Sequence, residues 1–213
     1  MVIYMIKKIV SNDIINMNTY LIIDENRAFI VDPGGNYEEL LKTINELNLT
    51  ILGILLTHAH VDHTFLIGKF NCPIYLHEKE VEVLRYSNIS LYDSFNLDMP
   101  FNDKDLNIIK VKDNDIIKLN DKEIKVIHTP GHTKGSVCYL IDKKLFSGDT
   151  LFKLSCGRCD LPTGSEIDMA KSLVKLIDSL DDDVKVYPGH DEATSIGYEK
   201  FNNFQYKYYK KMV

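Results

Sequence analysis

The sequence lacks the long apolar run of a membrane-spanning helix, because none of its hydrophobic stretches approaches the required ~18–20 residues. It also lacks a secretory signal: in the opening MVIYMIKKIV the lysines follow the apolar part, and no small-residue cleavage site is present. Four cysteines in 213 residues are too few for a disulfide framework. We therefore expect a cytoplasmic protein with no membrane partner.

Concentrated positive charge is absent as well. The chain carries 25 basic and 31 acidic residues, for a net charge of −6, and its lysines are scattered. The densest basic group, KYYKK near the C-terminus, is typical of a solvated helix end. Because a nucleic-acid binder gathers basic residues on one face, we expect no nucleic-acid partner. The composition leaves the oligomeric state open.

The chain shows no Pro/Ser-rich linker, no fixed-period repeat and no low-complexity tract, so we expect one domain over residues 1–213. Short strands are predicted first, followed by an amphipathic helix in NYEELLKTINELN and a buried strand at 51–57. A second series of short strands begins at 107 and ends in a helix at about 166–180. Two runs of strands, each closed by a helix, predict two sheets packed face to face with helices outside.

The second helix shows both a start signal and an apolar face. Ser165 and Asp168 resemble a capping box at its beginning. The expected apolar face consists of Ile167, Ala170, Leu173, Ile177 and Leu180. After one more strand, VKVYPG, the sequence predicts a single aromatic-rich helix at the C-terminus, whose aromatic residues belong either to the core or to an interface.

Residues 86–106 show no clean period and mix aromatics with turn formers. The segment is longer than a usual connection, and such loops are often lids or binding loops. A loose surface insertion is the equal alternative.

The strongest functional signal is THAHVDH, which follows the apolar run ILGILL. His58 and His60 are two apart and point the same way in an extended segment, while Asp62 and His63 fall where a helix can begin. Histidine and aspartate are both ligands for borderline divalent ions. Four such groups within six positions at a strand end predict a metal site.

Three later stretches have a similar form, with an apolar strand followed by a tight turn that carries one ligand-type residue. These residues are His132 in VIHTPGHT, Asp149 in KLFSGDT and His190 in KVYPGH. The glycine before each one lets the backbone turn tightly and approach closely. Seven ligands are too many for one tetrahedral ion, so we expect two divalent ions bridged by a carboxylate and a water.

The set HAHVDH, HTPGHT, SGDT and PGH closely resembles the metallo-β-lactamase superfamily in order and spacing. The resemblance implies an α/β fold, a four-layer αββα sandwich with the metals at one edge of the two sheets. It also implies that His58, His60 and His132 hold the first metal and that Asp62, His63 and His190 hold the second, with Asp149 between them. Zinc is the first expectation, and iron and manganese are alternatives.

The stretch GDTLFKLSCGRCDLPTGS resembles that of short glyoxalase II-like hydrolases, the hydroxyacylglutathione hydrolase-like group, and of related persulfide dioxygenases. The ending TSIGYEKFNNF resembles the same short group. Full-length glyoxalase II has a further C-terminal helical domain that binds glutathione. This sequence ends shortly after His190, so we expect no such domain, and the identity of the thiol carrier stays open.

Two close divalent ions lower the pKa of a bridging water and polarise a carbonyl oxygen. The first expectation is therefore a thioesterase that cleaves S-2-hydroxyacyl thiols such as S-lactoylglutathione, with Asp62 also orienting the hydroxide. The alternatives are a persulfide dioxygenase with a single iron, a lactonase or phosphodiesterase on the same scaffold, and a metal-binding module without catalysis.

Several residues near these stretches have two interpretations. Asp32 resembles an aspartate that supports the metal ligands in the family, or it caps a turn. Arg158 and Asp160 either pair with each other or hold the loop, and Arg158 could instead contact a substrate carboxylate. Cys156 and Cys159 form a C-x-x-C that we interpret as coincidence, with a redox pair or a soft metal site as the alternatives.

Overall fold

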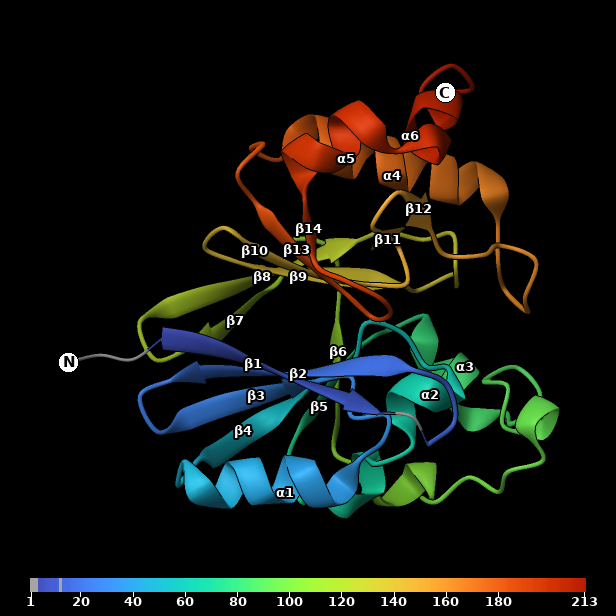
Figure 1. Ribbon diagram of the computed structural model, residues 1–213. Coiled ribbons are helices and arrows are strands. Elements are labelled where there is room, and N and C mark those ends of the chain that lie inside the picture. The colour runs from blue at the N-terminus through green and yellow to red at the C-terminus, as the bar shows by residue number, and fades with distance from the viewer. Residues whose placement is uncertain (1–3, 12) are drawn as a thin grey trace.

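The computed structural model describes residues 4–11 and 13–213, which form the expected four-layer αββα sandwich (Figure 1). Two six-stranded sheets pack face to face. Helix α1 (Tyr37–Glu46) lies on the outer face of the first sheet, and α4 (Glu166–Ser179), α5 (Ile196–Asn202) and α6 (Phe204–Tyr209) cover the second. The predicted fold class is confirmed.

The first sheet has the order β1-β2-β3-β4-β5-β6. Its first three strands are antiparallel, and β3 to β6 run parallel to one another. Two short helices, α2 (Val61–Thr64) and α3 (Glu80–Arg85), follow β4 and β5. The strands are β1 (Tyr4–Ser11), β2 (Met17–Asp24), β3 (Arg27–Val31), β4 (Thr50–Leu55), β5 (Ile74–His77) and β6 (Ile108–Val111).

The second sheet has the order β14-β13-β10-β9-β8-β7 and is antiparallel except where β10 meets β13. A small hairpin of β11 (Leu151–Phe152) and β12 (Ser155–Cys156) follows β10. The six strands are β7 (Ile116–Leu119), β8 (Lys122–His128), β9 (Val137–Ile141), β10 (Lys144–Gly148), β13 (Lys185–Pro188) and β14 (Thr194–Ser195).

Three apolar clusters separate the four layers. Alternate residues of β2 serve two of them: Leu21 and Ile23 pack in the cluster that includes α1, while Tyr20 and Ile22 pack between the sheets. This alternation follows from the period of two along a strand. A third cluster joins the second sheet to α4 and α6. Each sheet therefore has apolar residues on both faces, as a four-layer sandwich requires.

Two features of the C-terminal third differ from expectation. Ser165 caps α4 by accepting a hydrogen bond from the Asp168 N–H, but Ile167 is 59% exposed instead of lying on the buried face. Met169 and Leu176 are buried in its place. The predicted single terminal helix is two helices, α5 and α6, which meet at Asn203.

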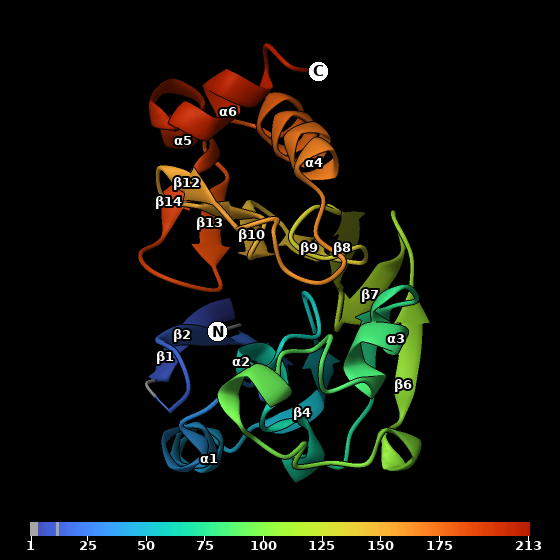
Figure 2. The ribbon, with the colours of Figure 1, turned by 90° about the vertical axis from the view of Figure 1, so that its right-hand side faces the viewer.

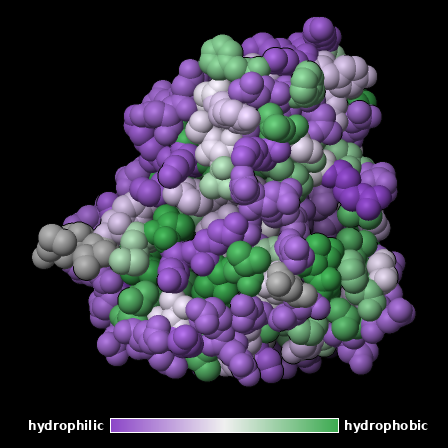
Figure 3. All heavy atoms as spheres, in the orientation of Figure 1, coloured by the Kyte–Doolittle hydropathy of each residue, from purple (hydrophilic) through white to green (hydrophobic). Residues whose placement is uncertain are grey.

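Hydrophilic residues cover most of the molecular face in Figure 3, and hydrophobic ones gather in its lower half. Within residues 4–11 and 13–213, none of the helices has the length and apolar character needed to cross a membrane.

Candidate metal centre

Four of the predicted ligands follow β4 directly. His58 and His60 lie in the extended segment after the strand, and Asp62 and His63 lie in α2, which begins immediately after His60. All four side chains are buried. None of these four side chains is more than 6% exposed, so bulk water can solvate little of their polar surface.

The other three predicted ligands come from the second sheet. His132 follows β8, Asp149 follows β10 and His190 follows β13, and the strand ends bring all three to the edge where α2 lies (Figure 2). The structure thus gathers all seven residues at one edge of the two sheets.

Two glycines permit this close approach, as the sequence predicts. Gly148, just before Asp149, has φ of +47°, and a Cβ there would lie 2.3 Å from Thr57 Oγ1. A Cβ on Gly189, just before His190, would lie 2.5 Å from Asp149 Oδ1. A side chain at either position would separate the ligand-bearing turns.

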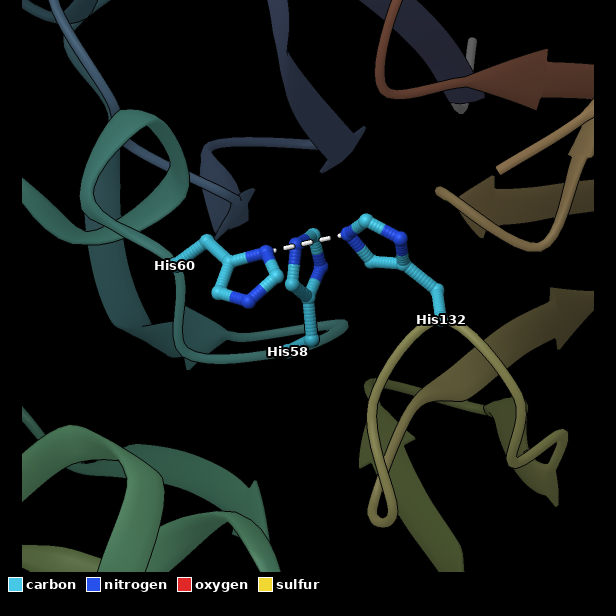
Figure 4. Close-up of side chains that lie close together, drawn as sticks. All are labelled: His58, His60 and His132. Atoms are coloured by element: carbon cyan, nitrogen blue, oxygen red, sulfur yellow. Dashed lines mark hydrogen bonds between the residues drawn. The ribbon is translucent and has the colours of Figure 1, made fainter. Parts of the chain in front are cut away.

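The seven side chains form overlapping groups whose ligand atoms lie within 4.8 Å of one another: His58, His60 and His132; His58, His63 and Asp149; and Asp62, His63 and His190. Figure 4 shows the three rings of the first group converging, with His60 Nδ1 2.9 Å from His132 Nε2.

Asp149 lies between the first and last of these groups. Its Oδ2 is 3.5 Å from the Nε2 atoms of both His132 and His190, and its Oδ1 is 3.4 Å from His63 Nε2. Asp62 Oδ2 is 3.2 Å from His190 Nε2 on the other side. A carboxylate in this position can contact ions on both sides.

Several buried polar atoms of the cluster have no hydrogen-bond partner among the described residues. They include His58 Nε2, His60 Nε2, His63 Nε2 and Asp149 Oδ1. Leaving such atoms unpaired costs about 1–3 kcal/mol each. Imidazole nitrogens and carboxylate oxygens are donors that divalent ions accept. The cluster therefore fits divalent metal ions and does not discriminate zinc from iron.

Burial and neighbouring charge set suitable protonation states for part of the cluster. Burial lowers the pKa of His60 to about 3 and the pKa of His58 well below its usual value, so both rings are neutral. Burial opposes the charged form of Asp149, but His63 and the other histidines around it hold its pKa well below the usual range. Neutral imidazoles and ionised carboxylates are the forms that bind metal.

His63 and His190 differ in this respect. Burial disfavours their protonated forms, yet the surrounding carboxylates prevail, raising the pKa of His63 well above its usual value and that of His190 to about 10. Positive charge thus compensates Asp62 and Asp149 at this position. A bound cation would provide the same compensation and displace the protons.

Comparison with known proteins supports the same assignment. Residues 15–190 match the Metallo-beta-lactamase superfamily. The chain belongs to this superfamily.

Three similar proteins illustrate its range. The hydroxyacylglutathione hydrolase GloC of Haemophilus influenzae is 33% identical over 84% of this chain and 87% of its own. The solved B3 metallo-β-lactamase BLEG-1 has a TM-score of 0.82 and 33% identity, covering 95% of this chain and 99% of that one. TTHA1623, solved in a di-iron-bound form, has a TM-score of 0.81 and 29% identity, covering 93% and 98%. The superfamily makes this protein a hydrolase with a divalent-metal site.

Asp32 follows β3 and lies next to His63, one of the predicted ligands. Its carboxylate accepts hydrogen bonds from the backbone N–H and the hydroxyl of Thr57, at 2.8 and 2.7 Å, and its Oδ2 lies 3.0 Å from His63 Nδ1. A carboxylate on the far nitrogen of a ligand imidazole fixes the ring's orientation and tautomer. Of the two interpretations of Asp32, the structure favours support of a predicted ligand.

Glu80 is a buried acid that the sequence analysis missed. Its Oε2 accepts a hydrogen bond from Ala59 N at 2.9 Å, and its Oε1 accepts one from Gly135 N at 2.8 Å. Ala59 separates His58 from His60, and Gly135 lies in the turn that carries His132. Glu80 therefore joins the ligand segments of the two sheets. Its sequence signal, an acid at a helix start, also describes many exposed residues.

Backbone carbonyls orient two other rings. His132 Nδ1 lies 2.7 Å from Arg158 O, and His190 Nδ1 lies 2.6 Å from Asn16 O, so each ring can donate a hydrogen bond and leave Nε2 facing the centre. The Arg158 side chain instead pairs with Asp160, which is one of the interpretations that the sequence leaves open.

Cys156 and Cys159, the two cysteines of the C-x-x-C, lie on either side of Arg158 in the same segment. Cys156 is buried and Cys159 half-buried, and burial raises the pKa of Cys159 to about 11 and that of Cys156 to about 12. Neither thiol has the low pKa of a reactive cysteine. Coincidence therefore remains our interpretation of the motif.

Proposed function

We propose that the protein is a metal-dependent thioester hydrolase, and that S-2-hydroxyacyl thiols such as S-lactoylglutathione are the first substrate class to test. The observation that carries the proposal is the all-nitrogen-and-oxygen cluster, with Asp149 placed between two histidine groups at the floor of an open cavity. Similarity to GloC, a hydroxyacylglutathione hydrolase, supports the thioester class.

The seven residues would hold two divalent ions: His58, His60 and His132 on one side, Asp62, His63 and His190 on the other, and Asp149 between them. Such a pair supplies an acidified water and an electrophile for a carbonyl oxygen when bound. Zinc is our first choice, and the di-iron form of TTHA1623 makes iron the principal alternative.

Asp62 has the chemistry of a positioning group for the attacking water. Burial opposes its ionisation, but His63 and His190 lower its pKa, so the carboxylate is charged. It also lines the cavity, where it can accept a hydrogen bond from water and orient a lone pair toward the substrate carbonyl. A thiolate is a good leaving group, so the reaction requires no strong general acid from the protein.

The test is thiol release from S-lactoylglutathione and from an uncharged thioester, using protein loaded separately with zinc, iron and manganese. We expect metal-dependent hydrolysis of at least one thioester, with Asp149→Ala inactive. Failure to release thiol from either thioester would overturn the proposal.

Four further assays identify the alternatives. Oxygen uptake with a persulfide would indicate a dioxygenase, and lactone or phosphodiester hydrolysis would indicate another reaction on the same scaffold. Opening of a β-lactam ring would indicate the activity named for BLEG-1.

A further inference from the structure

The cavity over the predicted metal centre has a volume of about 530 Å³ and mainly apolar walls. Four separate segments supply these walls. They contribute Ile15 between β1 and β2, Leu91 and Phe95 from residues 86–106, Phe152 of β11, and Leu161 before α4. The long segment 86–106 is therefore part of the binding cavity, which favours its interpretation as a binding loop.

Phe95 and Ile15 are 38% and 41% exposed, although both are large and apolar. Exposed apolar side chains that line one concave site mark a place where an apolar ligand can be buried.

Apart from the predicted metal centre, the cavity has little free positive charge. Among its described lining residues, Arg158 is the one basic side chain other than the histidines of the centre. Its Nε and Nη2 donate hydrogen bonds to Asp160 Oδ1 and Oδ2 at 2.7 and 2.6 Å. Lys153, next to Phe152, pairs with Glu192 at 2.6 Å and does not line the cavity.

Glutathione carries a carboxylate at each end, and recognising them takes cations or directed hydrogen-bond donors. The cavity offers one guanidinium, that of Arg158, and Asp160 already occupies the pair of N–H groups with which it would bind a carboxylate. Its other walls gain binding energy by covering apolar surface.

We propose that the substrate presents an uncharged, apolar group to this cavity, so that glutathione is not the preferred thiol carrier. This inference rests on the proposed thioester hydrolase function and concerns only the group beside the reacting thioester. The apolar group can belong to the acyl side or to an uncharged thiol, and in both cases the described lining residues of the cavity offer the two carboxylates of glutathione no unpaired arginine or lysine.

The experiment combines two acyl groups with two thiols. Lactoyl and hexanoyl thioesters of glutathione and of N-acetylcysteamine, which is uncharged, are compared by kcat/KM with the metal-loaded full-length protein. We expect the hexanoyl ester of N-acetylcysteamine to exceed S-lactoylglutathione by roughly tenfold or more, because each methylene in an apolar pocket counts for a factor of this order. A larger effect of the acyl change or of the thiol change identifies the side that occupies the cavity.

A roughly tenfold preference for the glutathione esters over the N-acetylcysteamine esters would overturn the inference and leave the thioester hydrolase function intact. Equal rates for all four esters would overturn it in the same way. Hydrolysis of none of the four would overturn the proposed function, and the inference with it.

Two variants test the walls and the ion pair separately. Phe95→Ser should lower kcat/KM for the hexanoyl ester of N-acetylcysteamine roughly tenfold with unchanged metal content. Its matched control is Phe204→Ser, a 78% exposed phenylalanine on α6 that does not line the cavity, and we expect no change there. A Phe95→Ser protein with the parent's selectivity would contradict the apolar wall.

Asp160→Asn should release Arg158 and raise kcat/KM for the glutathione esters relative to the N-acetylcysteamine esters by roughly two- to fivefold, the scale of an exposed ion pair. Both side chains are well exposed, so the fold should tolerate the change. An unchanged ratio would contradict the claim that this pair removes a cation from recognition.

Discussion

The two sheets supply the metal centre in different ways. The first places four predicted ligands within six residues after a single strand, β4. The second places one each after β8, β10 and β13, and the chain between His132 and His190 includes the whole of α4. A dense local motif and three dispersed turns thus form one cluster, and neither sheet contains it alone.

This difference affects how each half is stabilised. The ligands of the first sheet are held locally, by Asp32 on the neighbouring strand end and by the start of α2. The turns of the second sheet depend on contacts that cross the sandwich, such as Glu80 with Gly135 and Asn16 with His190. The effects of substitutions in the two halves on metal binding, activity and stability can therefore be compared directly.

Replacing one ligand from each sheet should have the largest effect. We expect His60→Ala and Asp149→Ala each to lose bound metal and more than about 100-fold in activity. Even a substitution of a group that only hydrogen-bonds to a ligand lowers metal affinity or activity by about 10–100-fold. Metal analysis and thioester hydrolysis measure the two losses. The matched control is Asp121→Ala, at an exposed position in the turn after β7, which should retain both. Full activity in either ligand variant would show that one half suffices.

Glu80→Gln should weaken the hydrogen bonds that connect the ligand segments of the two sheets. A glutamine amide presents a donor where one of the two backbone N–H groups needs an acceptor, so we expect a loss of about 1–3 kcal/mol in stability. Metal affinity should fall about 10–100-fold. Chelator competition and thermal unfolding measure these effects.

The control for Glu80 lies on the same helix. Glu82 is exposed and pairs with Lys134, so Glu82→Gln should change neither quantity appreciably. Equal behaviour of the two variants would remove Glu80 from any role at the centre.

Asp32→Asn should have a smaller and more local effect than Glu80→Gln. The amide keeps the volume and one acceptor, but it loses the charge that faces His63 Nδ1. We expect about tenfold weaker metal binding, confined to one of the two ions. Titration of the apo protein with metal should then show one weakened step and one unchanged step. Equal weakening of both steps would mean that Asp32 affects both metal sites.

The smallest predicted effect concerns a second contact between the sheets, formed by two histidines that are not among the predicted ligands. His77 ends β5 and His128 ends β8, and their rings stack with centroids 4.2 Å apart. Burial lowers the pKa of His77 to about 4, and the neighbouring His128 and Lys79 contribute to the shift, while Glu78 and Asp113 oppose it. Burial also lowers the pKa of His128, and Lys79 and Lys175 act in the same direction. Both rings are therefore neutral in the folded protein near neutral pH.

Between about pH 6.5 and pH 4 the unfolded chain binds more protons than the folded one, so stability falls as the pH is lowered. We expect a loss of about 1–2 kcal/mol from His77 after allowing for screening. His77→Phe keeps a stacked ring without a titrating group and should flatten this part of the stability curve, measured by urea unfolding across the pH range. A curve parallel to that of the parent would show that His77 does not contribute to the pH dependence of stability.

The sequence predicts local features better than those that depend on distant contacts. The metal-site motif THAHVDH can be recognised because four ligand-type residues lie together at one strand end. The strands and the α4 cap follow from short-range patterns. The role of Glu80 could not be foreseen, because the two N–H groups it binds belong to Ala59 and Gly135, distant in sequence from each other.

The C-terminal helices illustrate the same limit. Their aromatic pattern predicts one helix, but the chain breaks at Asn203, whose side chain accepts the Tyr206 N–H and donates to Glu199. The buried Glu199 also accepts from Leu154 N, in the turn of the β11–β12 hairpin. A tertiary hydrogen-bond network therefore overrides the local helical pattern. Helix α4 shows the same limit. The sequence does not specify how this helix lies over the sheet, and in the structure Ile167 is exposed to solvent.

The most direct test of the joint metal centre is the number of divalent ions bound per chain. Apo protein would be titrated with zinc and, anaerobically, with ferrous iron, and bound metal would be measured after gel filtration. We predict two ions per chain for the parent protein and loss of both steps in Asp149→Ala, because that carboxylate lies between the two groups. Saturation at one ion per chain in an active parent protein would contradict the two-ion centre.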